Sequence, residues 1–158
     1  MDIRRTILER LKVHPAEIHS LTDGLSEEQL KERPAERKWS LHELTMHLCE
    51  TQDVFVERAA RMLTEERPQI VPYEPDEARQ NGLYFTENLT KRMREFEVQR
   101  ATLISLLQTL TDAQWKREGS HPEMKHYTIE KAMESFMRHE EHHLHQMFNV
   151  FFGLGGQR

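Results

Sequence analysis

Apolar residues recur every three or four positions over four long stretches of this chain, which is the spacing of one face of an α-helix. The stretches run from about Ile3 to Leu21, from Ser40 through Met62, from about Leu83 to Leu110, and from Ile129 to about Phe152. An amphipathic helix of this kind is not stable alone in water. Packing the four apolar faces together predicts an all-α fold, a four-helix bundle.

Residues typical of helix starts support these boundaries. Ser40 followed by Glu43 forms a capping box at the start of the second stretch. Thr128 stands in the N-cap position of the fourth stretch, and Ser26 in that of a short helical turn. Pro15 interrupts the first stretch and predicts a kink there.

The connections between the four stretches are long and unequal. Residues 22–39 and 111–127 form two of them, and residues 66–82 form a third that contains three prolines. Such lengths permit crossover connections, so a simple up-down order of helices is not assumed. No extended strand is evident. A length of 158 residues suits one domain, which we expect to cover residues 1–158.

Charge and hydropathy exclude several classes of protein. The chain has 22 basic and 27 acidic residues, a formal charge of −5, which gives no support to nucleic-acid binding. Its longest apolar run, Met147 to Leu154, is interrupted and far below the ~20 residues of a membrane span. The N-terminus lacks the pattern of a secretory signal. We therefore expect a cytoplasmic protein with neither nucleic acid nor membrane as a partner.

The chain contains ten histidines and one cysteine. A single cysteine excludes both an intramolecular disulfide and a cysteine-rich zinc site. Helical geometry places His139 and His143 on or beside the apolar face of the fourth helix, one turn apart. Two ligands with this spacing can share one metal ion, and His47 on the second helix could supply a third nitrogen. Alternatively, each could be a hydrogen-bonded core residue.

The other histidines divide by position. His14 lies on the apolar face of the first helix and is a further inward candidate. His142 and His145 fall well off the apolar face of the fourth helix. The remaining four are near helix ends or in loops and are expected to be solvated: His19, His42, His121 and His126.

Glu140 projects close to the centre of the fourth apolar face, where a carboxylate is costly unless it is paired. It could accept a hydrogen bond from a ligand histidine, act as a general base on a metal-bound water, or form an ion pair. Rotation of the helix could instead bring it to the rim. The same alternatives apply to Glu50 and Asp53, which lie one and two turns beyond His47.

Residues 139–143 also match the pattern H-E-x-x-H of metalloproteases. Such enzymes take a third ligand, often a downstream acid or histidine. No acidic residue follows Glu141, and only fifteen residues follow His143. The sequence therefore disfavours a protease.

Three segments, in order, resemble the DinB-like superfamily over almost the whole chain. They are K-W-S-L-H-E-L-T-M-H-L at 38–48, His121-Pro122 with Tyr127-Thr128-Ile129, and H-E-E-H-H-L-H-Q-M at 139–147. The resemblance implies a four-helix bundle with a divalent metal held by three histidines. Matched residue by residue, these are His47, His139 and His143, which helical spacing also selects. Zinc or nickel is expected, because imidazole suits either metal.

Members of that family with known activity include thiol transferases and isomerases that use small cellular thiols such as bacillithiol or mycothiol. Three imidazoles leave an open coordination position, as in catalytic metal sites. The resemblance therefore implies a metal-dependent enzyme acting on a small-molecule substrate. It would transfer a low-molecular-weight thiol to an electrophile, or hydrolyse its substrate with metal-bound water. Cys49 lies on a different face from His47, so the thiol would come from outside the chain.

Two other interpretations remain open. The protein could be a non-catalytic bundle that binds a metal or a small ligand. It could also be an interaction module that forms a homodimer, since Phe148, Phe151 and Phe152 crowd more than one face of the last helix.

Overall fold

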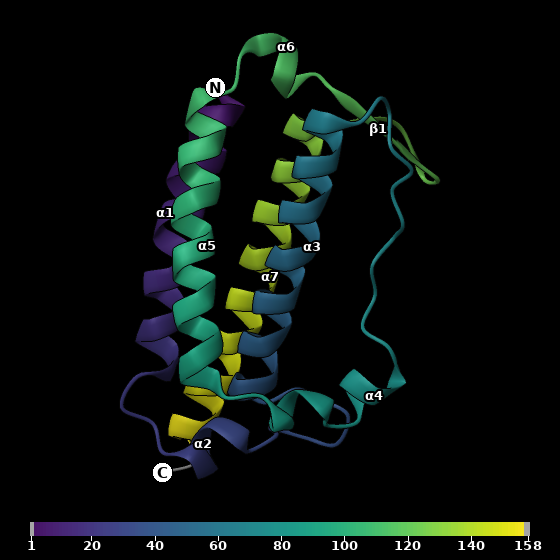
Figure 1. Ribbon diagram of the computed structural model, residues 1–158. Coiled ribbons are helices and arrows are strands. Elements are labelled where there is room, and N and C mark those ends of the chain that lie inside the picture. Colours follow the sequence, from purple (N-terminus) through teal and green to yellow (C-terminus); the bar gives the residue numbers. More distant parts are fainter. Residues whose placement is uncertain (1, 157–158) are drawn as a thin grey trace.

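A computed structural model describes residues 2–156 and the side chains up to Gly153. Its four long helices are α1 (Ile3–Thr22), α3 (Leu41–Thr64), α5 (Leu89–Thr109) and α7 (Ile129–Gly156). They pack side by side as a bundle (Figure 1), which confirms the predicted all-α fold.

The bundle has a crossover connection. Helices α1 and α7 run in one direction along the bundle, and α3 and α5 run in the other (Figure 1). Helix α7 packs against α1 and α3, and α5 likewise packs against α1 and α3. Because consecutive long helices α3 and α5 are parallel, residues 65–88 return along the full length of the bundle between them (Figure 1). The proline-containing linker is therefore a crossover, as its length suggested.

The predicted helix starts are confirmed in the side-chain geometry. The Ser40 hydroxyl caps α3 by accepting a hydrogen bond from the backbone N–H of Glu43, and the Glu43 carboxylate accepts one from the backbone N–H of Ser40. Thr128 accepts a hydrogen bond from the N–H of Lys131 at 3.0 Å. Ser26 caps the short α2 (Glu27–Lys31) in the same way. Helix α1 continues through Pro15 from Ile3 to Thr22.

The third long helix begins later than predicted. Gly82 has φ of +108° and precedes a separate 3₁₀ turn, η1 (Leu83–Thr86). Asn88 then caps α5, since its side chain accepts a hydrogen bond from the N–H of Lys91 at 2.9 Å. These two residues, Gly82 and Asn88, thus separate η1 from α5, which the apolar spacing had predicted as one helix.

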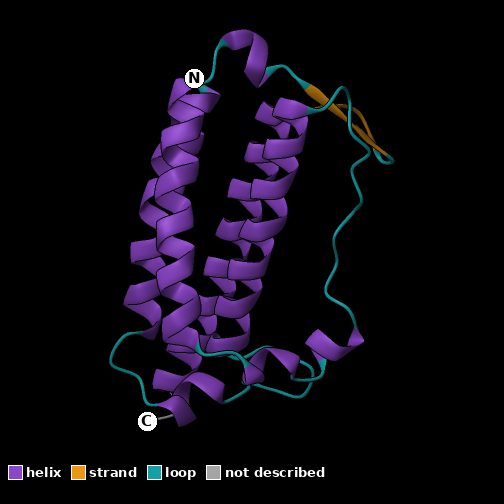
Figure 2. Cartoon of the chain, in the orientation of Figure 1, coloured by secondary structure: helices purple, strands orange, loops and turns teal. Residues whose placement is uncertain are grey.

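Several short elements were missed in the sequence: α4 (Glu77–Gln80), α6 (Asp112–Trp115), β1 (Glu118–His121) and β2 (Met124–Thr128). The two strands form an antiparallel hairpin beside the crossover (Figure 2). Ser120 exchanges backbone hydrogen bonds of 2.8 Å with Pro68 and Ile70 of the crossover. A Cβ on Gly119 would lie 2.6 Å from Ile70 Cγ1, so a larger residue here would force the Ile70 side chain to shift. Strands this short and polar carry no alternating pattern that predicts them.

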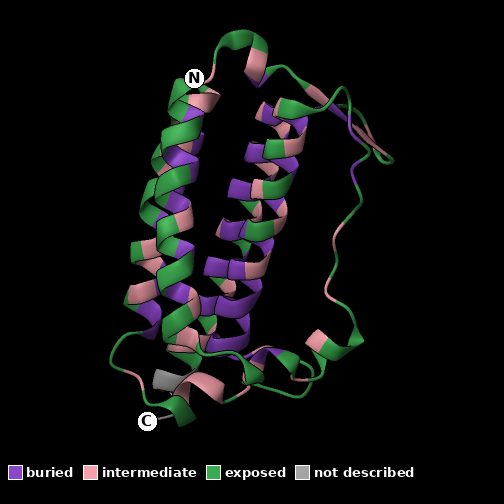
Figure 3. Cartoon of the chain, viewed as in Figure 1, coloured by how far each residue is buried: buried purple, intermediate pink, exposed green. Residues whose placement is uncertain are grey.

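Buried residues line the inner faces of the helices (Figure 3) and form two apolar clusters. Between the clusters, a hydrogen-bonded set takes one buried polar residue from each long helix: His14, Gln52, Arg100 and Glu140. We call these four the polar layer. Among residues 2–156, no helix combines the length and apolarity needed to cross a membrane.

Candidate metal centre

Three histidines from two helices converge near the end of the bundle where α3 begins. His47 lies in the second turn of α3, and His139 and His143 lie one turn apart on α7. Each pair of Nε2 atoms among them is 3.1 Å apart. Imidazoles bound to one ion at ~2.0–2.1 Å place their nitrogens about 3.0–3.4 Å apart. We call these three residues the histidine triad, and its spacing fits a single divalent ion.

The triad is set up to remain neutral. Burial lowers the pKa of His47 to about 2 and that of His139 to about 3, and the neighbouring imidazoles add to both shifts. Burial likewise lowers the pKa of His143. Neutral imidazole is the form that binds metals. Three converging ring nitrogens cannot all satisfy one another by hydrogen bonding, whereas one cation would accept all three lone pairs.

Hydrogen bonds at the far side of two rings orient them toward this point. The Nδ1 of His143 donates to the side-chain oxygen Oε1 of Gln146 at 2.7 Å, which leaves the lone pair on Nε2. The Nδ1 of His47 lies 3.3 Å from the hydroxyl of Tyr84. That hydroxyl donates its own proton to Glu50 at 2.5 Å, so its oxygen can accept from His47. Among the described residues, Nδ1 of His139 is buried without a partner.

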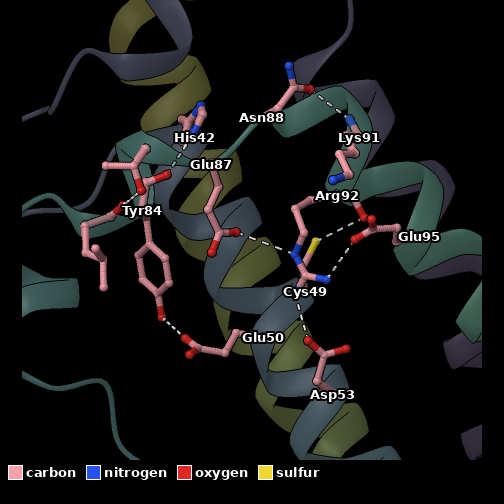
Figure 4. A network of polar contacts seen from close by, with 12 residues as sticks. His42, Cys49, Glu50, Asp53, Tyr84, Glu87, Asn88, Lys91, Arg92 and Glu95 are labelled. Carbon is pink, nitrogen blue, oxygen red and sulfur yellow. Dashed lines mark hydrogen bonds and ion pairs between the residues drawn. The ribbon is translucent and has the colours of Figure 1, made fainter.

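Glu50 joins the crossover to the triad. Its carboxylate accepts hydrogen bonds from Tyr84 of η1 and from Tyr73 of the crossover, each at 2.5 Å. Arg79 of α4 donates to its other oxygen at 2.6 Å. Figure 4 shows the Tyr84 hydroxyl pointing at Glu50. The sequence singled out Glu50 but neither tyrosine, because nothing in a long linker indicates which of its residues returns to α3.

Glu140 forms the ion pair that was one of its possible roles. Its oxygens bind Arg100 and, at 2.6 Å, Nδ1 of His14. Arg100 also donates to Gln52 and to the carbonyl of Leu11, each at 2.7 Å. Glu140 is 0% exposed, which excludes a position at the rim. Both inward candidates outside the triad, His14 and Glu140, thus belong to the polar layer.

Of the histidines predicted to be solvated, His126 is exposed and His19 and His121 are half-buried. His142 and His145 are exposed, but His42 is buried, and the expectation that it is solvated is wrong. Its Nε2 donates to the carbonyl oxygen of Tyr84 at 2.9 Å, and burial lowers its pKa. The 3₁₀ turn that covers this end of α3 was not evident in the sequence.

The two other candidates near His47 point away from the triad. Cys49 is buried on the side of α5, and burial raises the pKa of its thiol to about 12. Asp53 forms an ion pair of 2.8 Å with Arg92 of α5 (Figure 4). At neutral pH the chain therefore supplies no thiolate of its own, in agreement with the sequence argument.

Known proteins resemble this chain along most of its length. A protein of Bacillus subtilis with the name "Putative metal-dependent hydrolase YfiT" is 27% identical over 131 residues, which cover 82% of this chain and 74% of that protein. A protein of the same designation from Halalkalibacterium halodurans is 28% identical over 82% of this chain and 75% of its own. The uncharacterised Bacillus subtilis protein YuaE is 25% identical over 80% of this chain and 86% of its own.

Structure and family agree with these likenesses. A structure of Bacillus subtilis YfiT, a four-helix bundle of unusual topology, superposes with a TM-score of 0.81 at 23% identity, covering 96% of this chain and 87% of that one. The family model of the DinB superfamily matches residues 10–147. That range contains all four long helices in whole or in large part, including His47, His139 and His143. The chain therefore belongs to the DinB superfamily.

Proposed function

We propose that the protein is a metal-dependent enzyme whose metal ligands are His47, His139 and His143. The observation that carries this proposal is the convergence of three neutral ring nitrogens, each 3.1 Å from the other two. No hydrogen-bonding pattern among the three satisfies them all. Zinc or nickel suits such a set of imidazole ligands.

The reaction we propose is hydrolysis of a small-molecule substrate, and the designation of two relatives as metal-dependent hydrolases supports it. A divalent ion held by three imidazoles supplies an open coordination position and acidifies the water or thiol that occupies it. Transfer of an external small thiol would use the same position. Since burial raises the pKa of Cys49 to about 12, that thiol would have to be a second substrate.

The chain's own residues hold this centre in place. Gln146 and Tyr84 fix the protons of His143 and His47 on Nδ1, so that both Nε2 atoms face the shared point. Glu50 in turn orients Tyr84 and draws the crossover over the triad through Tyr73. Such outer contacts increase metal affinity, because they raise the basicity of the ligand and limit its rotation.

Elemental analysis of the purified protein tests the proposal. We expect about one equivalent of zinc or nickel in the wild type and none in the double variant His139→Ala, His143→Ala. The matched control is His142→Ala, His145→Ala, which removes two exposed histidines of the same helix. Equal metal content in all three proteins would contradict the proposed site.

Turnover distinguishes an enzyme from a metal-binding module. The metal-loaded protein is assayed with ester, amide and phosphoester substrates, and with several thiols paired with electrophiles. We expect turnover that disappears in the His139→Ala, His143→Ala variant and survives in the control. Metal binding without turnover on any substrate would favour the non-catalytic alternative.

We also propose that two copies associate through the end of α7. Phe148 and Phe152 are 49% and 56% exposed and lie against each other, with ring centroids 4.4 Å apart. Exposed aromatic side chains of this size commonly mark interfaces. Light scattering is expected to give a dimer mass for the wild type and a monomer mass for Phe148→Ser, Phe152→Ser.

A further inference from the structure

A cavity of about 840 Å³ lies at the end of the bundle where α3 begins. The loop before α3 forms one wall, with Arg37, Lys38 and Trp39. The crossover forms the opposite wall around α4, and the last turns of α7 contribute Gln146 and Val150. Nothing in the proposed metal centre accounts for this space.

The cavity adjoins the histidine triad at two points. Gln146 lines it and accepts the hydrogen bond from His143. Trp39 also lines it, and its ring centroid lies 4.8 Å from that of His47 and 6.3 Å from that of His143. A molecule in the cavity would therefore touch the side chains that touch the triad.

In the described part of the chain, the cavity lining contains positive charges that are not paired with carboxylates. Arg37 and Lys38 are exposed, and neither pairs with a carboxylate among the described residues. Arg33 is also present, but Glu43 balances it. Glu77 of α4 is the opposing charge and has no ion-pair partner among residues 2–153. The two free cations and one free anion leave a local excess of +1, in a chain whose formal charge is −5.

The rest of the lining is partly apolar. Trp39, Leu44 and Val150 offer carbon surface, and Asn81 and Asn149 offer carboxamides. A site of this composition suits an apolar body that ends in one anionic group. A dianion such as phosphate is matched less well, because Glu77 opposes the second charge.

We propose that this cavity binds the carboxylate end of a small, partly apolar substrate, with Arg37 and Lys38 as its cationic partners. As the recognition site of the enzyme, the cavity rests on the proposed function, since the remainder of that substrate would reach the triad past Trp39 and Gln146. The binding itself requires no metal.

Hexanoate and its uncharged isostere hexanamide are the probes. Trp39 lines the cavity, and the other tryptophan, Trp115, is buried against α7 and the far apolar cluster. Trp115→Phe therefore leaves a fluorophore that reports on the cavity. In metal-free protein at low salt, hexanoate is expected to change this emission with at least about tenfold higher affinity than hexanamide.

Three substitutions test the charges. Lys38→Gln and Arg37→Gly are each expected to weaken hexanoate binding about three- to tenfold, and to leave hexanamide unchanged. Arg37 has φ of +61°, a conformation that glycine adopts freely, so Arg37→Gly should keep the fold. The matched control Glu77→Gln removes the opposing charge and should strengthen hexanoate binding, a direction that damage to the fold would not produce.

Other results would overturn the proposal. Equal affinities for hexanoate and hexanamide, or hexanoate affinity unchanged by Arg37→Gly and Lys38→Gln, would exclude carboxylate recognition. Displacement of hexanoate by inorganic phosphate at lower concentration would assign the site to phosphate instead. These titrations use metal-free protein, so they are independent of the elemental analysis. If the protein prefers hexanoate to hexanamide but the purified protein contains no metal, only the proposed metal centre is refuted. Metal without hexanoate selectivity would refute only the cavity's role.

Discussion

Two buried polar clusters that share helix α7 differ in how their polar atoms are satisfied. The polar layer and the histidine triad meet at neighbouring residues of α7, since Glu140 belongs to one and His139 to the other. In the polar layer, the carboxylate of Glu140 faces a guanidinium and an imidazole, and Arg100 donates to two further oxygens. In the triad, three ring nitrogens face one another, and a cation is the counterpart that we propose for them.

This difference distinguishes a cluster that stabilises the fold from one that we propose binds a ligand. The polar layer pairs Glu140 with Arg100 and His14 inside the fold, although Nε2 of His14 has no hydrogen-bond partner among the described residues, and loss of this pairing is expected to lower stability. A cluster whose acceptors all face one point is satisfied only by a ligand, so a substitution in it should lower the affinity for that ligand. The comparison thus predicts that substitutions in the two clusters affect different measurements.

Arg100→Leu should have the largest effect. It leaves the carboxylate of Glu140 buried with His14 as its remaining hydrogen-bond partner, and removing one partner of a buried ion pair costs about 3–5 kcal/mol. The free energy of unfolding, from urea titration, measures the loss. Metal content per folded protein should stay as in the wild type.

The double variant Arg100→Leu, Glu140→Leu is the matched control, and it also serves if the single variant does not fold. Replacing both charges by apolar groups should restore most of the stability. A double variant as unstable as Arg100→Leu would mean that packing, rather than the unpaired charge, causes the loss.

The sequence predicts one side of this comparison better than the other. Helical spacing alone brings His139 and His143 to one face, and the apolar spacing of α3 places His47 at the edge of its inner face. The partners of Glu140 were not predictable, because a one-dimensional pattern does not say which residues of α1 and α5 lie at the same height. Tyr73 and Tyr84 were missed for a similar reason, since a crossover of residues 65–88 has no period that fixes its path.

Acid should destabilise the metal-free triad. Burial lowers the pKa of His47 to about 2 and of His139 to about 3, well below the ~6.5 of an unfolded histidine. Between these values the unfolded chain binds more protons than the folded one. The contribution of these neutral histidines to the free energy of unfolding is therefore complete above about pH 6.5. It declines as the pH falls toward the pKa values of the folded state.

Urea unfolding in the presence of EDTA at pH 7.5 and pH 5 measures this decline. Wild type should lose about 1–2 kcal/mol more between the two than His139→Asn, which lacks one of the titrating groups. An identical pH dependence in both proteins would show that the triad is not neutral in the fold.

Tyr84→Phe should weaken metal binding by about tenfold, within the range typical of losing an outer partner of a ligand histidine. The substitution removes the hydroxyl oxygen that accepts the hydrogen bond from Nδ1 of His47. Competition with a zinc chelator measures the affinity. Tyr127→Phe is the matched control, because it deletes a buried hydroxyl bound to Arg58 at the other end of the bundle. Equal losses in both variants would contradict the role of Tyr84.

Tyr73→Phe should have the smallest effect, and it tests how far the triad's influence extends. Tyr73 reaches Glu50 at 2.5 Å and Tyr84 at 3.4 Å, and it makes no hydrogen bond to a triad ring. Tyr84 and Arg79 still hold Glu50 without it, so metal affinity should fall only about two- to threefold. Because Tyr73 ties the crossover to α3, hydrogen exchange of residues 66–76 should accelerate in the variant. If Tyr73→Phe weakened metal binding as much as Tyr84→Phe, the position of the whole crossover, rather than the single bond to His47, would control the metal centre.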